Sequence, residues 1–280
     1  ATSLHKFGQI GEMLKMYYVL YTNPSYDDSL RYSVGFEGYI NNICNLYAHT
    51  KTNTISMCKF FDNDSKCSFD GQYYPAIIDT KPITNDIDIS TNMIISAPNK
   101  AGKTTILKSV LINIIMSQQV GCGFYTNAQL TPYSHIHSYL NIPDTSGRDS
   151  LFQAESRRCK EIIDIIKDND QNDRHFCIFD ELYSGTNPEE AVKSGNALLK
   201  YLESFKNVNF ILTTHYKDIC KKYKKSKHIT NYKMLVEVNE DKTFNYTYKL
   251  VKGISSIKGG LRVLKDMEYP DEIINEIENN

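Results

Sequence analysis

The sequence predicts an α/β fold: a mostly parallel sheet flanked by helices, an antiparallel β subregion and an N-terminal helical lead-in. The first observation is that, from residue 92 onward, short apolar runs alternate with segments of helical periodicity. Second, a Gly-Lys-Thr sequence at 102–104 stands between such a run and such a helix. Third, Asp180 and Glu181 directly follow another apolar run. Alternation of strands and helices implies a parallel sheet covered on both faces.

The beginning of the chain is predicted to be helical. Apolar residues recur at helical spacing over 3–22, and an Asn-Pro pair ends that segment. A second helix is predicted over about 26–48, although Gly35 and Gly38 weaken its middle. We therefore divide the chain into a helical lead-in, 1–55, and an α/β domain, 56–280.

Strand-like runs separated by Gly, Pro, Asp and Asn follow the lead-in and predict the antiparallel subregion. These runs lie at 56–61, 67–70, 75–79 and 86–89. Further strands are predicted at 92–97, 175–179 and 208–213, helices at 104–119, 150–167, 188–204 and 216–224, a hairpin of 231–238 with 243–251, and two closing helices at 256–267 and 271–279.

Composition excludes several classes of protein. The 280 residues carry a formal net charge of −1, so the chain as a whole offers no basic field for non-specific DNA binding. Its seven cysteines are scattered without metal-ligand spacing, which favours reduced thiols in an intracellular setting. We expect no membrane association, because no apolar run approaches the roughly 18 residues of a membrane span. The missing initiator Met suggests a processed or excised segment of a longer protein.

The stretch Ser-Ala-Pro-Asn-Lys-Ala-Gly-Lys-Thr-Thr at 96–105 is typical of a phosphate-binding loop. Backbone N–H groups of such a loop wrap a phosphate at the start of a helix. Lys103 can neutralise β- and γ-phosphate oxygens, and the Thr104 hydroxyl can ligate Mg²⁺. Ala97 stands where such loops usually carry their first glycine, and its methyl group is costly only if φ is positive. An ordinary loop before a helix is the alternative.

Three further positions follow predicted strands or begin a helix. Asp180 is expected to hold Mg²⁺ through water and Glu181 to orient or deprotonate an attacking water; an exposed acidic turn is the alternative. His215 follows the strand at 208–213, so an adjacent parallel strand would place it near the γ-phosphate, unless it is a satisfied strand-end histidine. Ser150 fits a capping box with Gln153, and the same helix start could meet the γ-phosphate of a nucleotide bound by a second copy.

A basic run, Lys-Lys-Tyr-Lys-Lys-Ser-Lys at 221–227, has two interpretations. Cations suit a helix C-terminus, so the run fits a solvated helix end. A contact to DNA or to a partner protein stays open beside it.

Taken in order, the motifs resemble the MutS family of DNA mismatch-repair ATPases, an ABC-type branch of the P-loop NTPases. The matching stretches are APNKAGKTT at 97–105, SGRDSLFQAE with Ser150, Phe152 and Glu155, FDELYSGTN at 179–187, TTHYKDI at 213–219, KPITNDIDI before the central strand, and YKLVKGISSIKGGLRVLKDMEYPDEII near the end. The resemblance covers roughly 60–275, and the two leading helices are similar to the tail of the family's core and lever region.

The resemblance implies ATP hydrolysis with ATP and Mg²⁺ in a composite site of a homo- or heterodimer. Lys103, Thr104, Asp180, Glu181 and His215 would act in cis, and Ser150 from the partner. It also implies DNA as a partner, bound mainly by domains outside this segment, and a MutL-like repair protein. The nucleotide contacts would be Pro98, Asn99, Lys100, Ala101, Gly102, Lys103, Thr104 and Thr105, with Ile83 against the base, because Pro82 stands where the family often has an aromatic residue.

Two other functions remain open at this point. A nucleotide-gated interaction module with little hydrolysis is suggested by Ala97 and Pro82. Another P-loop enzyme, such as a small-molecule kinase, is disfavoured because the span from Lys103 to Asp149 shows no evident cluster of acceptor-binding arginines.

Overall fold

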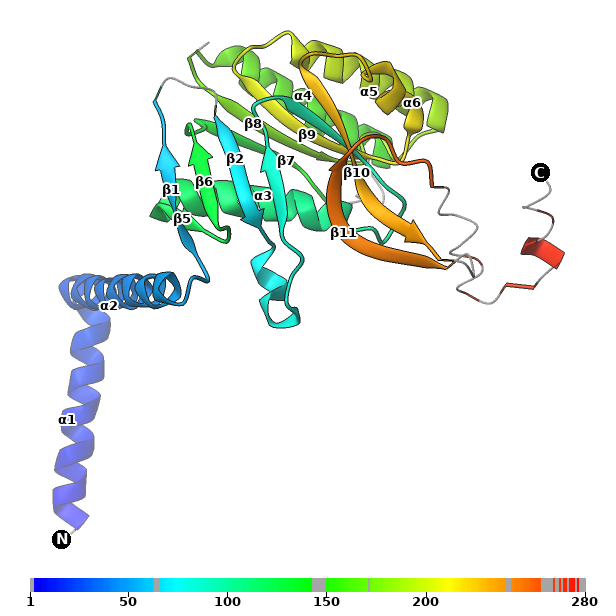
Figure 1. The fold of residues 1–280 in the computed structure, drawn as a ribbon. Coiled ribbons are helices and arrows are strands. Elements are labelled where there is room, and N and C mark those ends of the chain that lie inside the picture. The colour runs from blue at the N-terminus through cyan, green and yellow to red at the C-terminus, as the bar shows by residue number, and fades with distance from the viewer. Residues whose placement is uncertain are drawn as a thin grey trace. The chain divides into compact units, whose positions relative to one another are not determined.

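A computed structural model describes residues 3–62, 66–142, 150–170, 172–239 and 243–257, together with 264, 267, 269–270, 272–274 and 276. The chain divides into two compact units, residues 1–54 and residues 55–280 (Figure 1).

The first unit consists of two helices, α1 (Ser3–Thr22) and α2 (Pro24–Lys51). The Asn23 side chain accepts a hydrogen bond from the Ser25 N–H at 3.1 Å, and Pro24 occupies the first turn, where its missing N–H costs nothing. These two features explain why α2 begins before the predicted residue 26. Gly35 and Gly38 both lie within α2, and the structure records no buried residue in this helix.

The second unit contains two sheets, and the larger one has the strand order β11-β10-β4-β9-β8-β7. Neighbouring strands are parallel, except that β10 and β11 form an antiparallel hairpin. The strands are β4 (Asn92–Ser96), β7 (His135–Tyr139), β8 (His175–Asp180), β9 (Val208–Thr214), β10 (Ile229–Val238) and β11 (Phe244–Lys252).

The smaller sheet has the order β3-β2-β6-β1-β5 and is antiparallel apart from the parallel pair β1–β6. Its strands are β1 (Ser56–Phe60), β2 (Cys67–Gln72), β3 (Asn85–Asp88), β5 (Cys122–Gly123) and β6 (Asn127–Leu130).

The strand predicted at 75–79 is wrong, because Pro75–Thr80 form a 3₁₀ helix, η1. Proline fixes φ near −65° and lacks an N–H, which suits the first turn of a helix better than a sheet ladder. The Ile77 N–H donates to the Tyr74 carbonyl and the Thr80 hydroxyl to the Ile77 carbonyl, so local hydrogen bonds replace the expected pairing.

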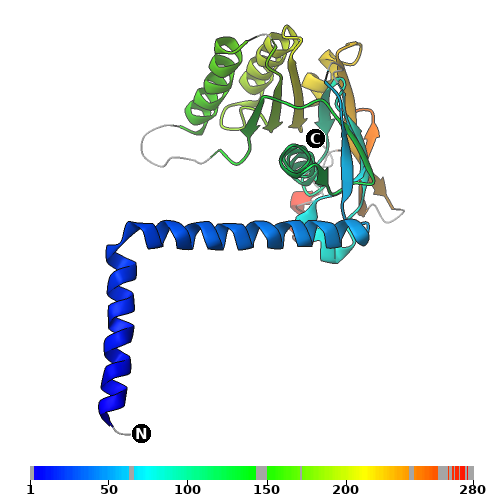
Figure 2. The same ribbon diagram turned by 90° about the vertical axis from the view of Figure 1, so that its left-hand side faces the viewer.

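Helix α3 (Lys103–Val120) lies between the two sheets, and Figure 2 shows it nearly end-on there. Side chains of a strand alternate between its two faces, so Met93 and Ile95 of β4 join a core with α3 while Ile94 faces the other way. Leu107, Val110 and Ile114 of α3 are fully buried in this core. The helix therefore joins the sheets through one continuous hydrophobic core.

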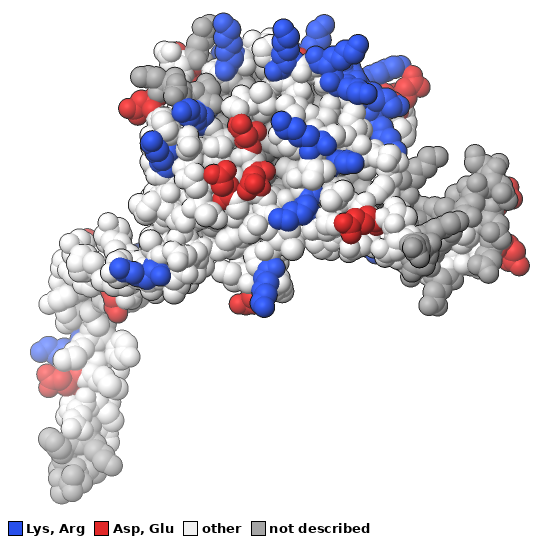
Figure 3. All heavy atoms as spheres, in the orientation of Figure 1, with Lys and Arg blue, Asp and Glu red and all other residues white. Residues whose placement is uncertain are grey.

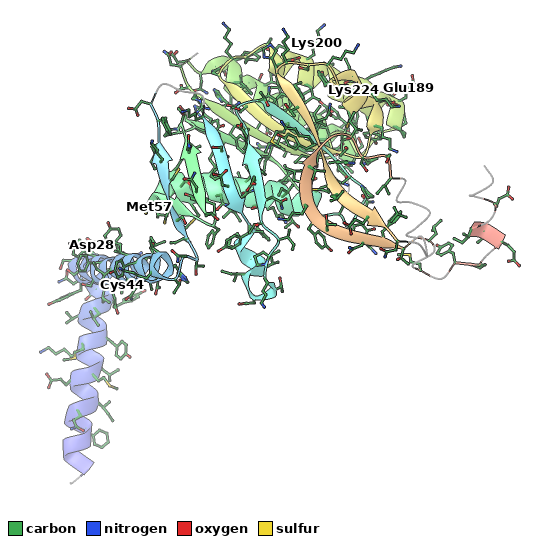
Figure 4. The ribbon with its side chains drawn as sticks, viewed as in Figure 1. Asp28, Cys44, Met57, Glu189, Lys200 and Lys224 are labelled. Carbon is green, nitrogen blue, oxygen red and sulfur yellow. The ribbon has the colours of Figure 1, made fainter. Side chains whose placement is uncertain are left out.

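The opposite face of the larger sheet is covered by α4 (Leu151–Asp168), α5 (Pro188–Glu203) and α6 (Lys217–Lys222). Helix α5 begins where the Asn187 side chain accepts from the Glu190 N–H at 3.0 Å. Glu189 in its first turn and Lys200 in its last, both labelled in Figure 4, match the helix dipole in sign.

The two closing helices predicted at 256–267 and 271–279 lie largely outside the described residues. Within the described part of the chain, no helix combines the length and the apolar character required to cross a bilayer. All seven cysteines are free, and five of them are buried.

Candidate functional site

Three strands bring the predicted site residues to one edge of the larger sheet. Strands β4, β9 and β8 are neighbours, and their register pairs Ser96 with Thr214 and Asp180 with Thr213. Because the strands are parallel, the loops that follow them leave from the same edge. This edge is where open α/β sheets bind their ligands.

The loop after β4 has the backbone of an anion-binding turn. Lys100 (φ 66°) and Gly102 (φ 93°) adopt the left-handed conformation, and alternation of this kind turns successive N–H groups into a concave nest. Ala97 is 4% exposed and is not among the described non-glycine residues with positive φ. Its methyl group therefore introduces no left-handed strain. A side chain at Gly102 would be strained by its φ and would stand 3.1 Å from the Tyr248 ring.

A cavity of about 690 Å³ opens beside this loop, and we call it the phosphate-side cavity. Of the eight predicted loop residues, only Ala101 does not line it, because its side chain is buried beneath the loop. The lining residues are Pro98, Asn99, Lys100, Gly102, Lys103, Thr104, Thr105, Tyr139, Asn141, Ile142, Leu151, Glu155, Asp180, Glu181, Ser184 and Tyr248.

The Lys103 ammonium lies inside this site with a side chain only 6% exposed. It donates to the Ala97 carbonyl at 3.0 Å and forms an ion pair with Glu181 Oε1 at 3.0 Å. The Pro98 carbonyl and Asn99 Oδ1 lie at 3.4 Å each. A buried cation is tolerable when it is paired and hydrogen-bonded in this way. Lys103 is thus held by its own loop and by the predicted catalytic acid.

Thr104 and Asp180 meet as the sequence predicts. The Thr104 hydroxyl donates to Asp180 Oδ2 at 2.7 Å, and the Thr213 hydroxyl donates to Asp180 Oδ1. Hydroxyl and carboxylate oxygens are the donors that Mg²⁺ prefers. Among the described residues, no group of three or more His, Cys, Asp or Glu side chains could hold a metal ion by itself. The pair Thr104 and Asp180 has the chemistry of a Mg²⁺ site, because Mg²⁺ binds through one or two protein oxygens together with substrate phosphates.

Glu181 and His215 are also close together. His215 Nδ1 lies 3.6 Å from Glu181 Oε2, although His215 does not line the cavity and its side chain is 45% exposed. The close polar contact with His215, and then the charge of Lys103, lower the pKa of Glu181 to about 2 against the opposing effect of burial. Glu181 is therefore an anion throughout the neutral range.

Ser150 lies at the exposed N-cap of α4. Its hydroxyl accepts from the Gln153 N–H at 3.3 Å, and Gln153 Oε1 accepts from the Ser150 N–H at 2.9 Å, so the predicted capping box is confirmed. Ser150 itself does not line the phosphate-side cavity, whereas the next residue, Leu151, does. Its expected action on a second copy's nucleotide stays a prediction.

A second cavity of about 360 Å³, the apolar cavity, shares Gly102, Thr105 and Tyr248 with the first. Ile83, predicted to contact the base, lines it and is 44% exposed. The full lining is Gln72, Tyr73, Tyr74, Ile77, Thr80, Lys81, Pro82, Ile83, Asn85, Gly102, Thr105, Ile106, Ser109, Met234 and Tyr248.

Two residues of the apolar cavity escaped the sequence analysis. Tyr248 (φ 55°) is held in place because Asn85, at 7% exposure, donates to the Tyr248 carbonyl and accepts from the Leu250 N–H. Gln72 is buried, and its Oε1 accepts from Ser109 and Asn113 of α3. Gln72 belongs to no local motif, and although Tyr248 begins the matching stretch at 248–274, nothing in that stretch marked it as a cavity residue.

Outside both cavities, three histidine rings stack on the larger sheet. His135 and His137 lie on β7 and His175 on β8, with His175 4.7 Å from His135 and 5.3 Å from His137 between ring centroids. His137 Nε2 and His175 Nδ1 are 3.0 Å apart. Burial, and then the charges of His175, His135 and Arg158, lower the pKa of His137 to about 4.

The basic run begins at the end of α6, and both of its interpretations stay open. Lys221 pairs with Asp218 at 2.9 Å, and the Lys222 ammonium lies over the Tyr223 ring. In Figure 3, Lys and Arg side chains gather along the upper edge of the second unit, near the place where Figure 4 labels Lys224.

Comparison with known proteins shows which family this chain belongs to. The family model described as MutS domain V matches residues 93–280. The endonuclease MutS2 of Staphylococcus epidermidis is 28% identical over 222 residues, 77% of this chain and 27% of that protein. For the endonuclease MutS2 of Lactococcus lactis subsp. cremoris, strain SK11, identity is 26%, with 90% of this chain and 32% of that protein covered.

The DNA mismatch repair protein MutS of Fusobacterium nucleatum is 27% identical over 198 residues, 69% of this chain and 21% of that protein. The chain thus spans about a fifth to a third of the length of these relatives. The matched region begins inside the central strand β4 and takes in the phosphate loop, both acids and His215. Since the family model covers well over half of the sequence, this chain belongs to the MutS family.

Proposed function

We propose that the chain is an ATP-binding and ATP-hydrolysing domain of the ABC-type P-loop NTPase class, within a MutS-like DNA repair protein. The observation that carries the proposal is the convergence of Lys103, Thr104, Asp180 and Glu181 on one cavity at the carboxyl edge of a parallel sheet. An ammonium, a hydroxyl and two carboxylates in that place match what phosphoryl transfer requires.

Each residue would have a role that follows from the chemistry of its side chain. Thr104 and Asp180 would hold Mg²⁺, which neutralises developing phosphate charge when bound. Lys103 would neutralise the β- and γ-phosphate oxygens, with the loop N–H groups around them. Glu181 would orient the attacking water, with His215 beside it.

The ion pair between Lys103 and Glu181 has a consequence for the order of events. His215 first, and then Lys103, lower the pKa of Glu181 to about 2, so the carboxylate is a weak base in this arrangement. A phosphate that attracts Lys103 would remove one of the interactions that lower this pKa. A bound nucleotide would therefore break the ion pair with Lys103 and leave Glu181 beside His215.

The apolar cavity is the proposed base site, because it adjoins the phosphate-side cavity and is walled by Ile83, Pro82 and Tyr248. Tyr248 offers the aromatic face that Pro82 does not. By the family resemblance, two copies or two related subunits would complete each other's sites through Ser150, and DNA and a MutL-like partner would be bound by the whole protein.

A nucleotide-gated module with little hydrolysis is the second candidate. The observation in its favour is that Lys103 and Glu181 are engaged with each other. Ala97, which first suggested this function, no longer supports it, since it carries no positive φ.

Phosphate release from ATP by the purified chain decides between the two candidates. We expect turnover that needs Mg²⁺ and falls on the order of 100-fold or more in Lys103→Ala, because a charged donor at the transferred group is lost. Lys108→Ala, on the same helix α3 outside both cavities, is the control. ATP binding without turnover would favour the gated module, and no nucleotide binding at all would refute both.

A further inference from the structure

The turn that follows β8 has an unusual backbone. Glu181 (φ 53°) and Tyr183 (φ 58°) are both non-glycine residues in the left-handed conformation. Such a conformation costs free energy and persists only where the surroundings fix it. The Glu181 N–H is anchored to the Thr213 carbonyl at 3.1 Å, which secures the start of the turn. The rest of the turn needs other partners.

Those partners come from α4 and β7. The Glu155 carboxylate of α4 accepts from the Ser184 N–H at 3.0 Å, from the Ser184 hydroxyl at 2.8 Å and from the Gly185 N–H at 3.1 Å. The Tyr183 N–H donates to the hydroxyl of Tyr139 on β7 at 3.3 Å. Three consecutive N–H groups of the turn are thus bound by side chains of other elements.

Glu155 is suited to this role by its environment. Its side chain is 2% exposed, so its charge is removed from water and needs the donors that the turn supplies. Burial raises the pKa of the neighbouring phenols of Tyr139 and Tyr183, which therefore stay neutral beside the carboxylate.

The turn also abuts the first residues of α4. A Cβ at Gly185 would lie 2.7 Å from the Phe152 nitrogen and 2.8 Å from Leu151 Cβ, so only glycine permits this approach. The Phe152 and Tyr183 rings pack at 5.6 Å between centroids. The turn and the helix are therefore packed in one fixed arrangement, and both contribute lining residues to the phosphate-side cavity.

We propose that Glu155 is a positioning residue: by binding the turn at 183–185 it aims Glu181 at the phosphate-side cavity and ties it to the helix that begins at Ser150. This inference rests on the proposed ATPase function. Glu155 itself has no part in the reaction. Its hydrogen bonds hold Glu181, which is expected to orient water, in a fixed position relative to α4, whose first turn is expected to contact the nucleotide of a second copy.

Loss of the carboxylate is expected to affect turnover more than binding. The loop at 98–105 and Lys103 would bind the nucleotide, and none of the hydrogen bonds of Glu155 reaches them. A small displacement of Glu181 spoils the alignment of the attacking water, on which the rate depends steeply.

Glu155→Gln is the first test, because its amide places a donor against one of the two bound N–H groups. We expect kcat for ATP to fall roughly tenfold or more, with KM within about twofold. Hydrogen exchange of the backbone amides at 183–185 should become faster. Glu161→Gln, on the same helix but 51% exposed, is the matched control and should change neither quantity. Unchanged kcat and unchanged exchange in Glu155→Gln would overturn the proposal.

Glu155→Asp keeps the carboxylate but shortens the side chain by one methylene group, which moves the carboxylate away from the turn. This variant tests the proposal if Glu155→Gln does not fold. It should show faster exchange at 183–185 and a lower kcat than the unaltered chain, and wild-type values of both would refute the positioning role. If the unaltered chain hydrolyses no ATP, the proposed function fails, but the exchange measurement still tells whether Glu155 holds the turn.

Discussion

The two cavities that meet at Gly102 and Tyr248 are built in different ways. The phosphate-side cavity is assembled mainly from short contiguous stretches, the loop at 98–105 and the pair Asp180 and Glu181. The apolar cavity combines residues in and on either side of η1, 72–74, 77 and 80–83, with side chains of β3 and of α3, β10 and β11, which are distant in the sequence. The reactive side chains of the phosphate-side cavity are thus close together in the sequence and can be recognised there. The lining of the apolar cavity is brought together only by the tertiary fold.

The comparison predicts that substitutions in the first cavity chiefly affect the rate and those in the second chiefly affect affinity. Glu181→Gln should produce the largest effect, a fall in kcat on the order of 100-fold, as expected when a group that activates water is removed. Nucleotide should bind as tightly or more tightly, because Lys103 loses a competing anion. Single-turnover hydrolysis and nucleotide titration measure the two quantities, and a Glu181→Gln variant with normal turnover contradicts the assignment.

Tyr248→Ala should have the next largest effect, now on affinity. Stacking of a base on an aromatic ring is worth roughly 1–3 kcal/mol by alanine substitution, so nucleotide affinity is expected to fall about tenfold, with kcat at saturation nearly retained. Tyr248→Phe keeps the ring and serves as the control. If Tyr248→Ala lowers kcat but leaves nucleotide affinity unchanged, the assignment of rate to the first cavity and of affinity to the second is wrong.

A third effect, of about the same size in free energy, concerns stability in acid and involves neither cavity. The folded-state pKa of His137 is lowered to about 4, below its ordinary 6.5, so the unfolded chain binds more protons between these values and stability falls as the pH drops. From pH 6.5 to pH 5 this one residue should cost about 1.5 kcal/mol of unfolding free energy.

Urea unfolding at the two pH values, for the unaltered chain and for His137→Gln, checks this. The variant should lose less stability over that interval. Glu181 cannot account for the loss, because its pKa of about 2 keeps it charged throughout that range, and its own contribution disappears only as the pH falls from about 4.5 through 2. Equal acid sensitivity in both proteins would assign the effect to other groups.

The same contrast explains what could be predicted from the sequence. Lys103, Thr104, Asp180 and Glu181 were found because a strand, a loop and a helix follow one another in a recognisable order. Ser150 was correctly placed at a helix cap, for the capping box is a local signal as well.

Features made by distant residues could not be predicted in this way. Tyr248 reaches the cavity only because Asn85 holds the backbone of β11. Glu155 belonged to a matching motif, but its role depends on a turn that lies 29 residues away in the chain. Strand β7 was missed because His-Ile-His-Ser-Tyr is too polar to read as a buried strand, and the strand at 75–79 was wrong because local helical bonds at Pro75 outweighed an apolar run.

The position of α3 links two distant parts of the second unit. Its first residue is Lys103, and just past its last turn the Gly121 carbonyl accepts from the Cys58 N–H of β1 at 2.9 Å. With 18 residues, the helix is a rod of about 27 Å at 1.5 Å per residue. A tilt of a few degrees at the phosphate loop would therefore displace β1, the strand that directly follows residues 1–54, by an ångström or more. If the proposed nucleotide is bound, this helix would transmit a displacement of the loop at 98–105 to β1.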